Sequence, residues 1–124
     1  MEDGVLQKSR AFALRIINMY RYLIAEHKEY VMSRQLLRSG TSIGANVTEA
    51  QDAQSGWDFV SKLQIALKEA RETSYWIYLL YESDFIDSKM NLSITRDLNV
   101  IISLLVAIIK SRKQNLEKEK KRKQ

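Results

Sequence analysis

The segment LLRSGTSIGANVTEA (residues 36–50) keeps the spacing of an α-helix but carries two glycines and several small polar residues. At about 100° per residue, it forms one narrow apolar stripe, made of Leu36, Ile43, Val47 and Ala50. Glycine costs about 1 kcal/mol relative to alanine inside a helix, so Gly40 and Gly44 need a compensating reason. We therefore predict that the backbone of a neighbouring helix approaches this segment closely.

A second stripe on the same segment predicts a second packing partner. It lies roughly opposite the first and consists of Arg38, Ser42, Ala45 and Glu49. Ser39 and Asn46 lie a heptad apart on the shoulder of the apolar stripe. We expect these two side chains to hydrogen-bond to helix backbone or to each other, and we expect the segment to have two partners.

Length and composition indicate a single, all-helical domain. A chain of 124 residues is large enough to bury one core but too small for two. It has no proline, only 4 glycines and 45% hydrophobic residues, which is typical of an all-α protein. It has no cysteine, and residues 1–4 (MEDG) lack the pattern of a signal peptide. We predict a cytoplasmic protein without disulfides.

Four periodic segments, separated by short polar breaks, predict four helices. We expect them at about residues 5–28, 33–54, 56–82 and 88–116, which form one domain over residues 1–116. Ser33 and Ser55 suit the N-caps of the second and third helices, and Asp58 follows Ser55 as in a capping box. Residues 117–124 form a basic tail that we expect to lack fixed structure.

Several helices carry more apolar surface than one bundle core requires. Residues 100–109 (VIISLLVAII) are apolar nearly all round, which predicts burial on all sides, and they are too few to span a bilayer. The third helix has a second face that mixes apolar groups and carboxylates: Ile65, Glu69, Glu72, Trp76 and Leu79. These extra faces predict self-association.

The positive charge is concentrated near the end of the chain. Residues 110–124 (KSRKQNLEKEKKRKQ) hold 8 Lys or Arg and 2 Glu, a net charge of +6, which leaves −1 for residues 1–109. Such a tail neutralises phosphates without recognising sequence, although similar tails serve only for solubility. The candidate nucleic-acid-binding residues are Lys110, Arg112, Lys113, Lys118, Lys120, Lys121, Arg122 and Lys123.

The residue types present argue against an enzyme. His27 is the one histidine of the chain, so neither a Ser-His-Asp triad nor a ferritin-like di-metal site has supporting context. Glu69 and Glu72 have the spacing of paired carboxylates, but a basic residue lies between them and we assign them structural roles. Gly40 and Gly44 do not fit a phosphate-binding loop. We predict no catalytic residue, no metal and no cofactor.

Aromatic residues cluster in the third expected helix, at Trp57, Tyr75, Trp76, Tyr78 and Tyr81. Platforms for single-stranded nucleic acid combine aromatic residues with cations, whereas several glutamates are mixed among these. We therefore predict that the aromatic residues pack in the core and between subunits.

Two segments carry a specific resemblance to a known family. They are LLRSGTSIGANVTEAQ (residues 36–51) and WDFVSKLQIALKEARETSYWIYLL (residues 57–80). Both resemble the bacterial "four helix bundle protein" family, first noticed as open reading frames in intervening sequences of large-subunit ribosomal RNA genes and often labelled ribosomal-like. The first and fourth helices match by pattern only.

The resemblance implies an antiparallel up-down bundle that assembles into a homopentameric ring. The accessory protein of diversity-generating retroelements is similar in architecture, and there a basic pentamer engages a reverse transcriptase and nucleic acid. The family has no established enzymatic activity. This chain departs from that comparison, because its body is nearly neutral and its basic tail is not part of the family motif.

The candidate structural and oligomer motif consists of Arg38, Ser39, Ser42, Asn46, Glu49, Glu69, Glu72 and Trp76. We expect Arg38 to pair with Glu72 or Glu69, either within one subunit or between two. A buried pair of this kind fixes helix register more than it stabilises, whereas an exposed pair contributes little.

Two functions of different classes follow. The first is a non-enzymatic, ring-forming adaptor that binds nucleic acid through its basic tails, RNA in preference to DNA, alongside an enzyme such as a reverse transcriptase. The second is an oligomeric scaffold that recruits a protein partner and has no nucleic-acid role. We favour the first, and we expect neither function to involve a membrane.

Overall fold

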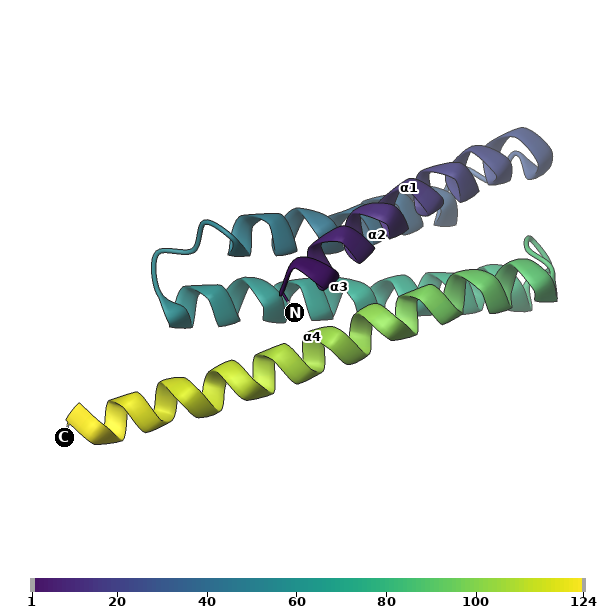
Figure 1. Cartoon of the computed structure of the whole chain (residues 1–124). Coiled ribbons are helices and arrows are strands. Elements are labelled where there is room, and N and C mark those ends of the chain that lie inside the picture. The colour runs from purple at the N-terminus through teal and green to yellow at the C-terminus, as the bar shows by residue number, and fades with distance from the viewer. Residues whose placement is uncertain (1, 124) are drawn as a thin grey trace.

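The computed structural model of the chain describes residues 2–123, with side chains described from Gly4 onward. Within this range the chain forms four α-helices and no strand (Figure 1): α1 Glu2–His27, α2 Met32–Ala50, α3 Gly56–Glu82 and α4 Ser88–Lys123. Successive helices run in opposite directions. The prediction of an all-α, four-helix fold is confirmed, while the ring of subunits remains a prediction.

One face of each helix forms the hydrophobic core. The apolar stripe predicted for α2 is at most 2% exposed throughout. The buried residues of α3 follow the spacing of one helix face and include Phe59, Leu63, Ala66, Ala70, Thr73, Ile77 and Leu80. From α1 the core receives chiefly Val5, Phe12, Ile16, Met19 and Leu23.

The two glycines of α2 lie directly against α1. A Cβ atom on Gly44 would be 3.3 Å from the backbone oxygen of Ser9, and one on Gly40 would be 2.8 Å from Cγ1 of the fully buried Ile16. The predicted close approach is therefore present, to backbone at Gly44 and to a side chain at Gly40. α3 also packs on α2, so this helix has the two partners that its sequence predicts, although the second stripe stays at the surface, where Arg38, Ala45 and Glu49 are exposed.

The start of α2 differs from the prediction that Ser33 is its N-cap. Met32 is the first helical residue, and Ser33 lies buried inside the first turn. The Glu29 carboxylate accepts hydrogen bonds from the backbone N–H groups of Val31, Met32 and Ser33 at 3.2, 3.0 and 2.7 Å. A carboxylate placed before the helix thus does what a capping hydroxyl normally does.

The connection from α2 to α3 begins earlier than predicted and ends where predicted. α2 ends at Ala50 instead of near Gln54, because residues 51–53 curl into backbone bonds of the tighter i to i−3 type. Ser55 is the N-cap of α3, as expected, and its Oγ accepts from the N–H of Asp58. The Asp58 carboxylate accepts from the N–H of Gln54, which completes a variant of the capping box.

α4 departs from two expectations. It continues as helix to Lys123, so the tail from residue 117 is helical over its described part instead of unstructured. Its apolar segment is also buried on one side only, since Ile101, Leu105 and Ile108 are buried while Val100 and Val106 are 43% and 42% exposed. Among the helices of residues 2–123, none covers the outer side of α4.

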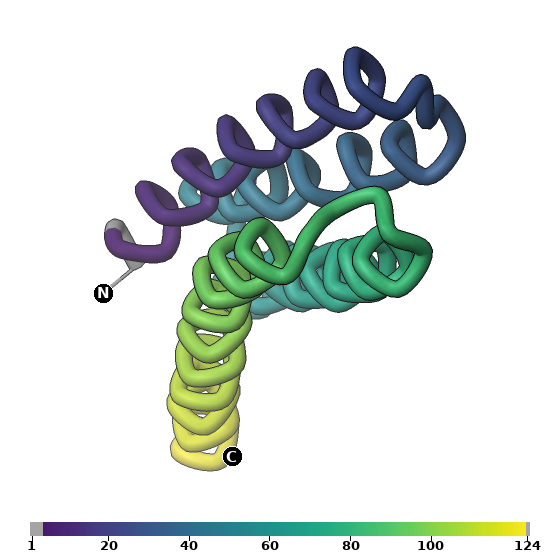
Figure 2. The backbone as a smooth tube through the Cα atoms, turned by 90° about the vertical axis from the view of Figure 1, so that its right-hand side faces the viewer, coloured from purple at the N-terminus to yellow at the C-terminus, as the bar shows by residue number. Residues whose placement is uncertain are grey.

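α4 packs mainly on α3 and much less on α1, from which it diverges (Figure 2). One ionic contact closes this short seam: Arg15 lies 2.6 Å from the Asp97 carboxylate and donates to the hydroxyl of Ser93 at 2.8 Å. Beside it lies a cavity of about 220 Å³ lined by residues of both helices, including Phe12 and Ile101. The contact between α1 and α4 is therefore the least extensive helix–helix contact of the bundle.

Candidate nucleic-acid interface

The predicted basic tail forms the last turns of α4, which extend past the other helices (Figure 1). All eight candidate cations lie on this one helix, between Lys110 and Lys123. Beyond Leu116 the helix continues for about 10 Å at the usual rise per residue. Residues 110–123 of α4, called the basic rod below, therefore hold all eight cations on one helix, although we expected the five from Lys118 onward to lie on a tail without fixed structure.

Two contacts with α3 position this part of α4. Leu116 packs against the first residue of α3, where a Cβ on Gly56 would be 2.5 Å from its Cδ2 atom. Four residues earlier, the Arg112 guanidinium lies 4.2 Å from the ring centroid of Phe59. Arg112 therefore acts partly as a packing group, because a cation over an aromatic face is attracted by the ring.

The other candidate cations face solvent or line a groove. Lys110 and Lys113 lie at the edge of a pocket of about 400 Å³ whose floor includes Leu67, Val106 and Ile109. Lys118, Lys120, Lys121, Arg122 and Lys123 are all exposed. The structure thus places seven of the eight cations where a polyanion could reach them.

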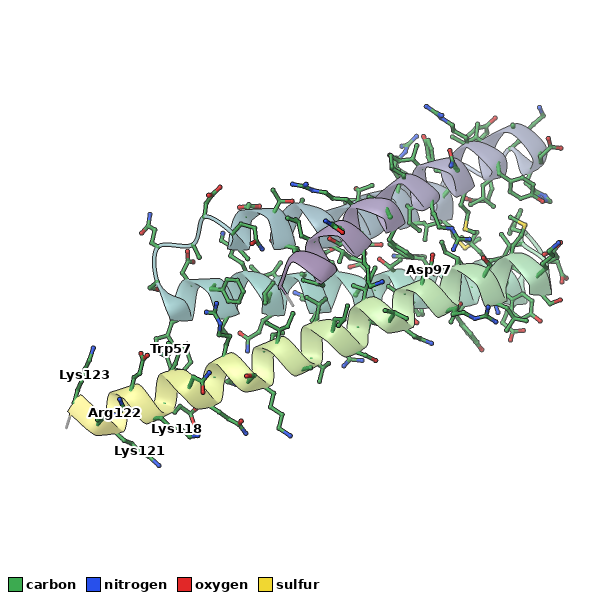
Figure 3. All side chains as sticks on the ribbon, in the orientation of Figure 1. Trp57, Asp97, Lys118, Lys121, Arg122 and Lys123 are labelled. Carbon is green, nitrogen blue, oxygen red and sulfur yellow. The ribbon has the colours of Figure 1, made fainter. Side chains whose placement is uncertain are left out.

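An aromatic side chain lies beside these cations. Figure 3 shows Trp57 between the first turn of α3 and the last turns of α4, with Lys123 on the same side of α4 and Lys118 and Lys121 on the other. The Trp57 side chain is 45% exposed. From the sequence we assigned it to packing, because several glutamates are mixed among the aromatic residues of this segment.

Acidic groups occupy the neighbouring α2–α3 connection. Glu49, Asp52 and Asp58 line a polar pocket of about 440 Å³ together with Lys62. The Lys62 ammonium lies 3.5 Å from the Glu49 carboxylate, so one of these charges is partly neutralised. The end of α4 extends beyond this acidic connection (Figure 1), so its last cations lie away from these carboxylates.

The motif residues of α2 and α3 form a network on the opposite side of α2 from α1. Arg38 donates to the Glu72 carboxylate at 2.6 Å and lies 3.9 Å from that of Glu69, as expected. Trp76 also donates to Glu72, through its indole N–H at 3.2 Å. The Arg38 side chain is 55% exposed, so in the single chain this pair is less buried than the hypothesis assumed. Oε2 of Glu69 is buried and makes no hydrogen bond among the described residues.

The small polar residues of α2 bond mainly to helix backbone, as predicted. Of the two residues for which we expected this, Ser39 donates to the carbonyl of Leu36 at 3.5 Å and Asn46 donates to that of Ser42. Ser42 in turn donates to the carbonyl of Arg38. Sequence reasoning missed one buried contact between helices, in which the Thr73 hydroxyl donates to Oγ of Ser39 at 3.0 Å. A hydroxyl within an apolar stripe was the signal that could have revealed it.

The described residues hold no group of three or more His, Cys, Asp or Glu that could bind a metal ion. His27 instead lies between aromatic rings, with centroids 5.5 Å from those of both Tyr22 and Phe85. The absence of an enzymatic activity remains a prediction.

α4 is long and apolar enough, by length and composition, to cross a membrane. The apolar stretch of α4 is longer than residues 100–109, and 33% of it is buried inside the structure. Core helices of soluble proteins meet the same criterion, so it is weak evidence for a membrane span. The apolar length of α4 shows instead that much of its apolar surface is uncovered in one chain.

Comparison with known proteins agrees with the resemblance carried by residues 36–51 and 57–80. Residues 2–107 match the family described as 23S rRNA-intervening sequence protein. A crystal structure of a protein of unknown function from the S23 ribosomal protein family of Bacteroides thetaiotaomicron VPI-5482 is similar, with 55% identity and a TM-score of 0.85. The similarity covers 86% of this chain and 98% of that one. No curated protein matches the chain.

The family match and the candidate interface occupy different parts of the molecule. The match ends at residue 107, and the cations begin at Lys110. The basic rod is therefore an addition to the part that defines the family. Since the match covers most of its length, the chain belongs to the 23S rRNA-intervening sequence protein family.

Proposed function

We propose that this protein is a non-enzymatic adaptor that binds nucleic acid, RNA in preference to DNA, through the basic end of α4. The observation that carries the proposal is the ordered rod of cations on a body of net charge −1. Neutralising phosphates releases their counterions, which favours binding without recognition of sequence. The family description, which refers to an intervening sequence of 23S rRNA, is the reason to favour RNA.

Self-association belongs to the same proposal. The exposed Val100 and Val106 lie on opposite flanks of the uncovered side of α4, where a second copy would bury apolar surface. Several copies in a ring, five by family resemblance, would gather their rods and multiply the local positive charge. An assembly of this kind could hold RNA next to an enzyme such as a reverse transcriptase.

Charge reversal at the tip of the rod tests the proposal. We expect the variant with Lys118, Lys120, Lys121 and Lys123 all changed to Glu to lose RNA binding at low salt. If each lysine contacts one phosphate, the dependence of log K on log salt concentration should become shallower by about 3 for a single-stranded RNA. Fluorescence anisotropy with a labelled RNA, repeated over a salt series, measures both quantities.

The matched control carries the same four reversals on the body, at Arg10, Arg21, Lys68 and Lys89, all of which are exposed. It has the same net charge as the rod variant but leaves the rod intact, so its RNA binding should fall much less. Equal losses in the two variants would show that total charge matters and that the rod is not the site.

The second candidate function is a scaffold that recruits a protein partner, with no nucleic-acid role. The uncovered apolar side of α4 and the groove beside Leu67 favour it. Removal of residues 117–124 separates the two functions and spares Leu116, which packs on α3. If the protein is the adaptor, the truncated variant should lose RNA binding and keep its assembly. If it is the scaffold, the truncated variant should still bind its protein partner.

A further inference from the structure

We propose that Trp57 is a stacking site for a base of single-stranded nucleic acid bound along the rod of α4. The proposal rests on the adaptor function above and extends it, because it names single strands as the ligand class. It revises the sequence-based assignment of Trp57 to packing.

Residues before and after Trp57 in the sequence both contact α4. Its neighbour Gly56 touches Leu116 of α4, and Phe59, two residues further on, carries Arg112 over its ring. The backbone of Trp57 therefore belongs to the junction of α3 and α4. Helical spacing turns Phe59 and Val60 into the core, where both are buried, and leaves Trp57 outside.

The chemistry around Trp57 is that of a single-strand site. Figure 3 shows this large, exposed ring next to the last turns of α4, on the side that carries Lys123, while Lys118 and Lys121 lie on the opposite side. Single-strand sites combine a basic track for the backbone with aromatic rings on which bases stack, irrespective of sequence. The bases of a duplex already stack on each other, so a duplex can use the cations but not the indole.

A comparison along α3 supports a specific role for this aromatic residue. Tyr75 and Tyr78 are exposed as well, but they lie toward the other end of α3, near its connection to α4. Trp57 is the exposed aromatic residue at the end where the cations gather. Tyr78→Ala therefore provides a matched control, since it removes a ring of similar exposure on the same helix.

The test compares two strands of equal length, a short oligouridylate and an abasic phosphodiester strand, together with an RNA duplex of equal phosphate count. We expect the full-length protein to bind the oligouridylate more tightly than the other two. Trp57→Ala should weaken oligouridylate binding between about fivefold and a hundredfold, because stacking contributes to this extent per base. Its affinity for the abasic strand should stay unchanged, and Trp57→Phe should keep part of the preference.

A direct measurement uses Trp57 itself. The chain has 2 tryptophans, so Trp76→Phe leaves Trp57 as the sole indole. Oligouridylate should quench its fluorescence and the abasic strand should not. Native mass spectrometry of Trp57→Ala would show whether its assembly matches that of the wild type.

The outcomes separate this proposal from the adaptor function. If Trp57→Ala and Tyr78→Ala bind all three ligands as the wild type does, while reversal of the rod charges abolishes binding, the adaptor stands and the stacking site is wrong. If Trp57→Ala alters the assembly, the residue is a subunit contact and the proposal is also wrong. If the wild type binds none of the ligands, both proposals fall.

Discussion

At the scale of single residues, Gly40 is constrained because α1 occupies the space that its side chain would need. A Cβ there would come within 3.0 Å of two carbon atoms of the buried Ile16. We expect Gly40→Ala to lower the free energy of unfolding by about 1–2 kcal/mol, since overpacking outweighs the gain in helix propensity. Denaturant unfolding followed by circular dichroism measures the change.

The control for this prediction is Gly4→Ala in α1. A Cβ at Gly4 would meet nothing within 4 Å, so the same substitution should be neutral or slightly stabilising. A second control, Gly40→Ala combined with Ile16→Ala, should show less than the sum of the two single losses. A neutral Gly40→Ala would mean that α1 and α2 are further apart than described.

The Arg38–Glu72 contact differs from other ion pairs on the surface because several groups meet there. Glu72 accepts from both Arg38 and Trp76, while Glu69 lies next to them. A double-mutant cycle with Arg38→Ala and Glu72→Gln should give a coupling energy of about 1 kcal/mol. Thermal unfolding of the four proteins at one pH provides the values.

Lys62 and Glu49 supply the comparison, since they join the same two helices at 3.5 Å and the Glu49 side chain is 60% exposed. Their coupling should lie below about 0.5 kcal/mol. Equal coupling in the two cycles would contradict a special role for the Arg38 network. A value for Arg38 that rises with protein concentration would instead place that network at a subunit contact.

At the scale of the helix, Glu29 makes the start of α2 sensitive to pH. Partial burial opposes its ionisation, but hydrogen bonds from the backbone of Ser33, Met32 and Val31 outweigh burial and lower the pKa of Glu29. A lowered pKa in the folded state means that the unfolded chain takes up the proton first. The cap therefore stabilises fully above the unfolded pKa of about 4.3, and this contribution is lost as the pH falls through the folded pKa.

We expect Glu29→Gln to lower the free energy of unfolding at neutral pH by about 0.5–2 kcal/mol, the usual cost of losing a helix cap. The difference from the wild type should shrink as the pH falls below the unfolded pKa of about 4.3, and it should vanish below the lowered pKa of folded Glu29, where the wild-type carboxyl is itself protonated. Unfolding measured from neutral to acidic pH checks both parts. Glu26→Gln, one turn earlier in exposed α1 sequence, is the control and should show no such difference.

The presence of the four helices could be predicted from the sequence, whereas some of their ends could not. The apolar stripes of α2 and α3 predict their buried faces because burial follows the 3.6-residue period. Ser55 could be predicted as a cap since its hydroxyl acts on the nearest turn. Glu29 could not, because a carboxylate before the helix reaches the same groups only after the loop folds back.

The candidate interface was predicted in part for a similar reason. The distribution of charge along the sequence is enough to locate the cations from Lys110 onward. Their order as a helix depends on Leu116 against Gly56 and on Arg112 over Phe59, which are contacts between residues far apart in sequence. Trp57 became a candidate only when those contacts brought it beside the rod.

At the scale of the whole molecule, the uncovered side of α4 predicts how copies meet. Val100→Asp and Val106→Asp each place a charge on an exposed apolar position, so the fold should persist while a subunit contact there is lost. We expect at least one of them to reduce the mass of the assembly to that of a single chain. Native mass spectrometry gives the mass, and circular dichroism verifies the helix content.

Leu14→Asp is the matched control, because Leu14 is exposed on the outer side of α1. Its assembly should resemble that of the wild type. If all three variants assemble normally, the subunit contact lies elsewhere. If the wild type is itself a single chain, the prediction of a ring is wrong.

The mechanical consequence of the long α4 concerns how a load on its tip is transmitted. The 36 residues from Ser88 to Lys123 include neither glycine nor proline, so the helix has no built-in hinge. Its buried residues from Ile94 to Ile109 hold the helix on α3, and the part after Leu116 projects as an arm of about 10 Å. A load on the lysines of this arm is therefore transmitted along a straight helix and is borne first by the contacts of Leu116 with Gly56 and of Arg112 with Phe59.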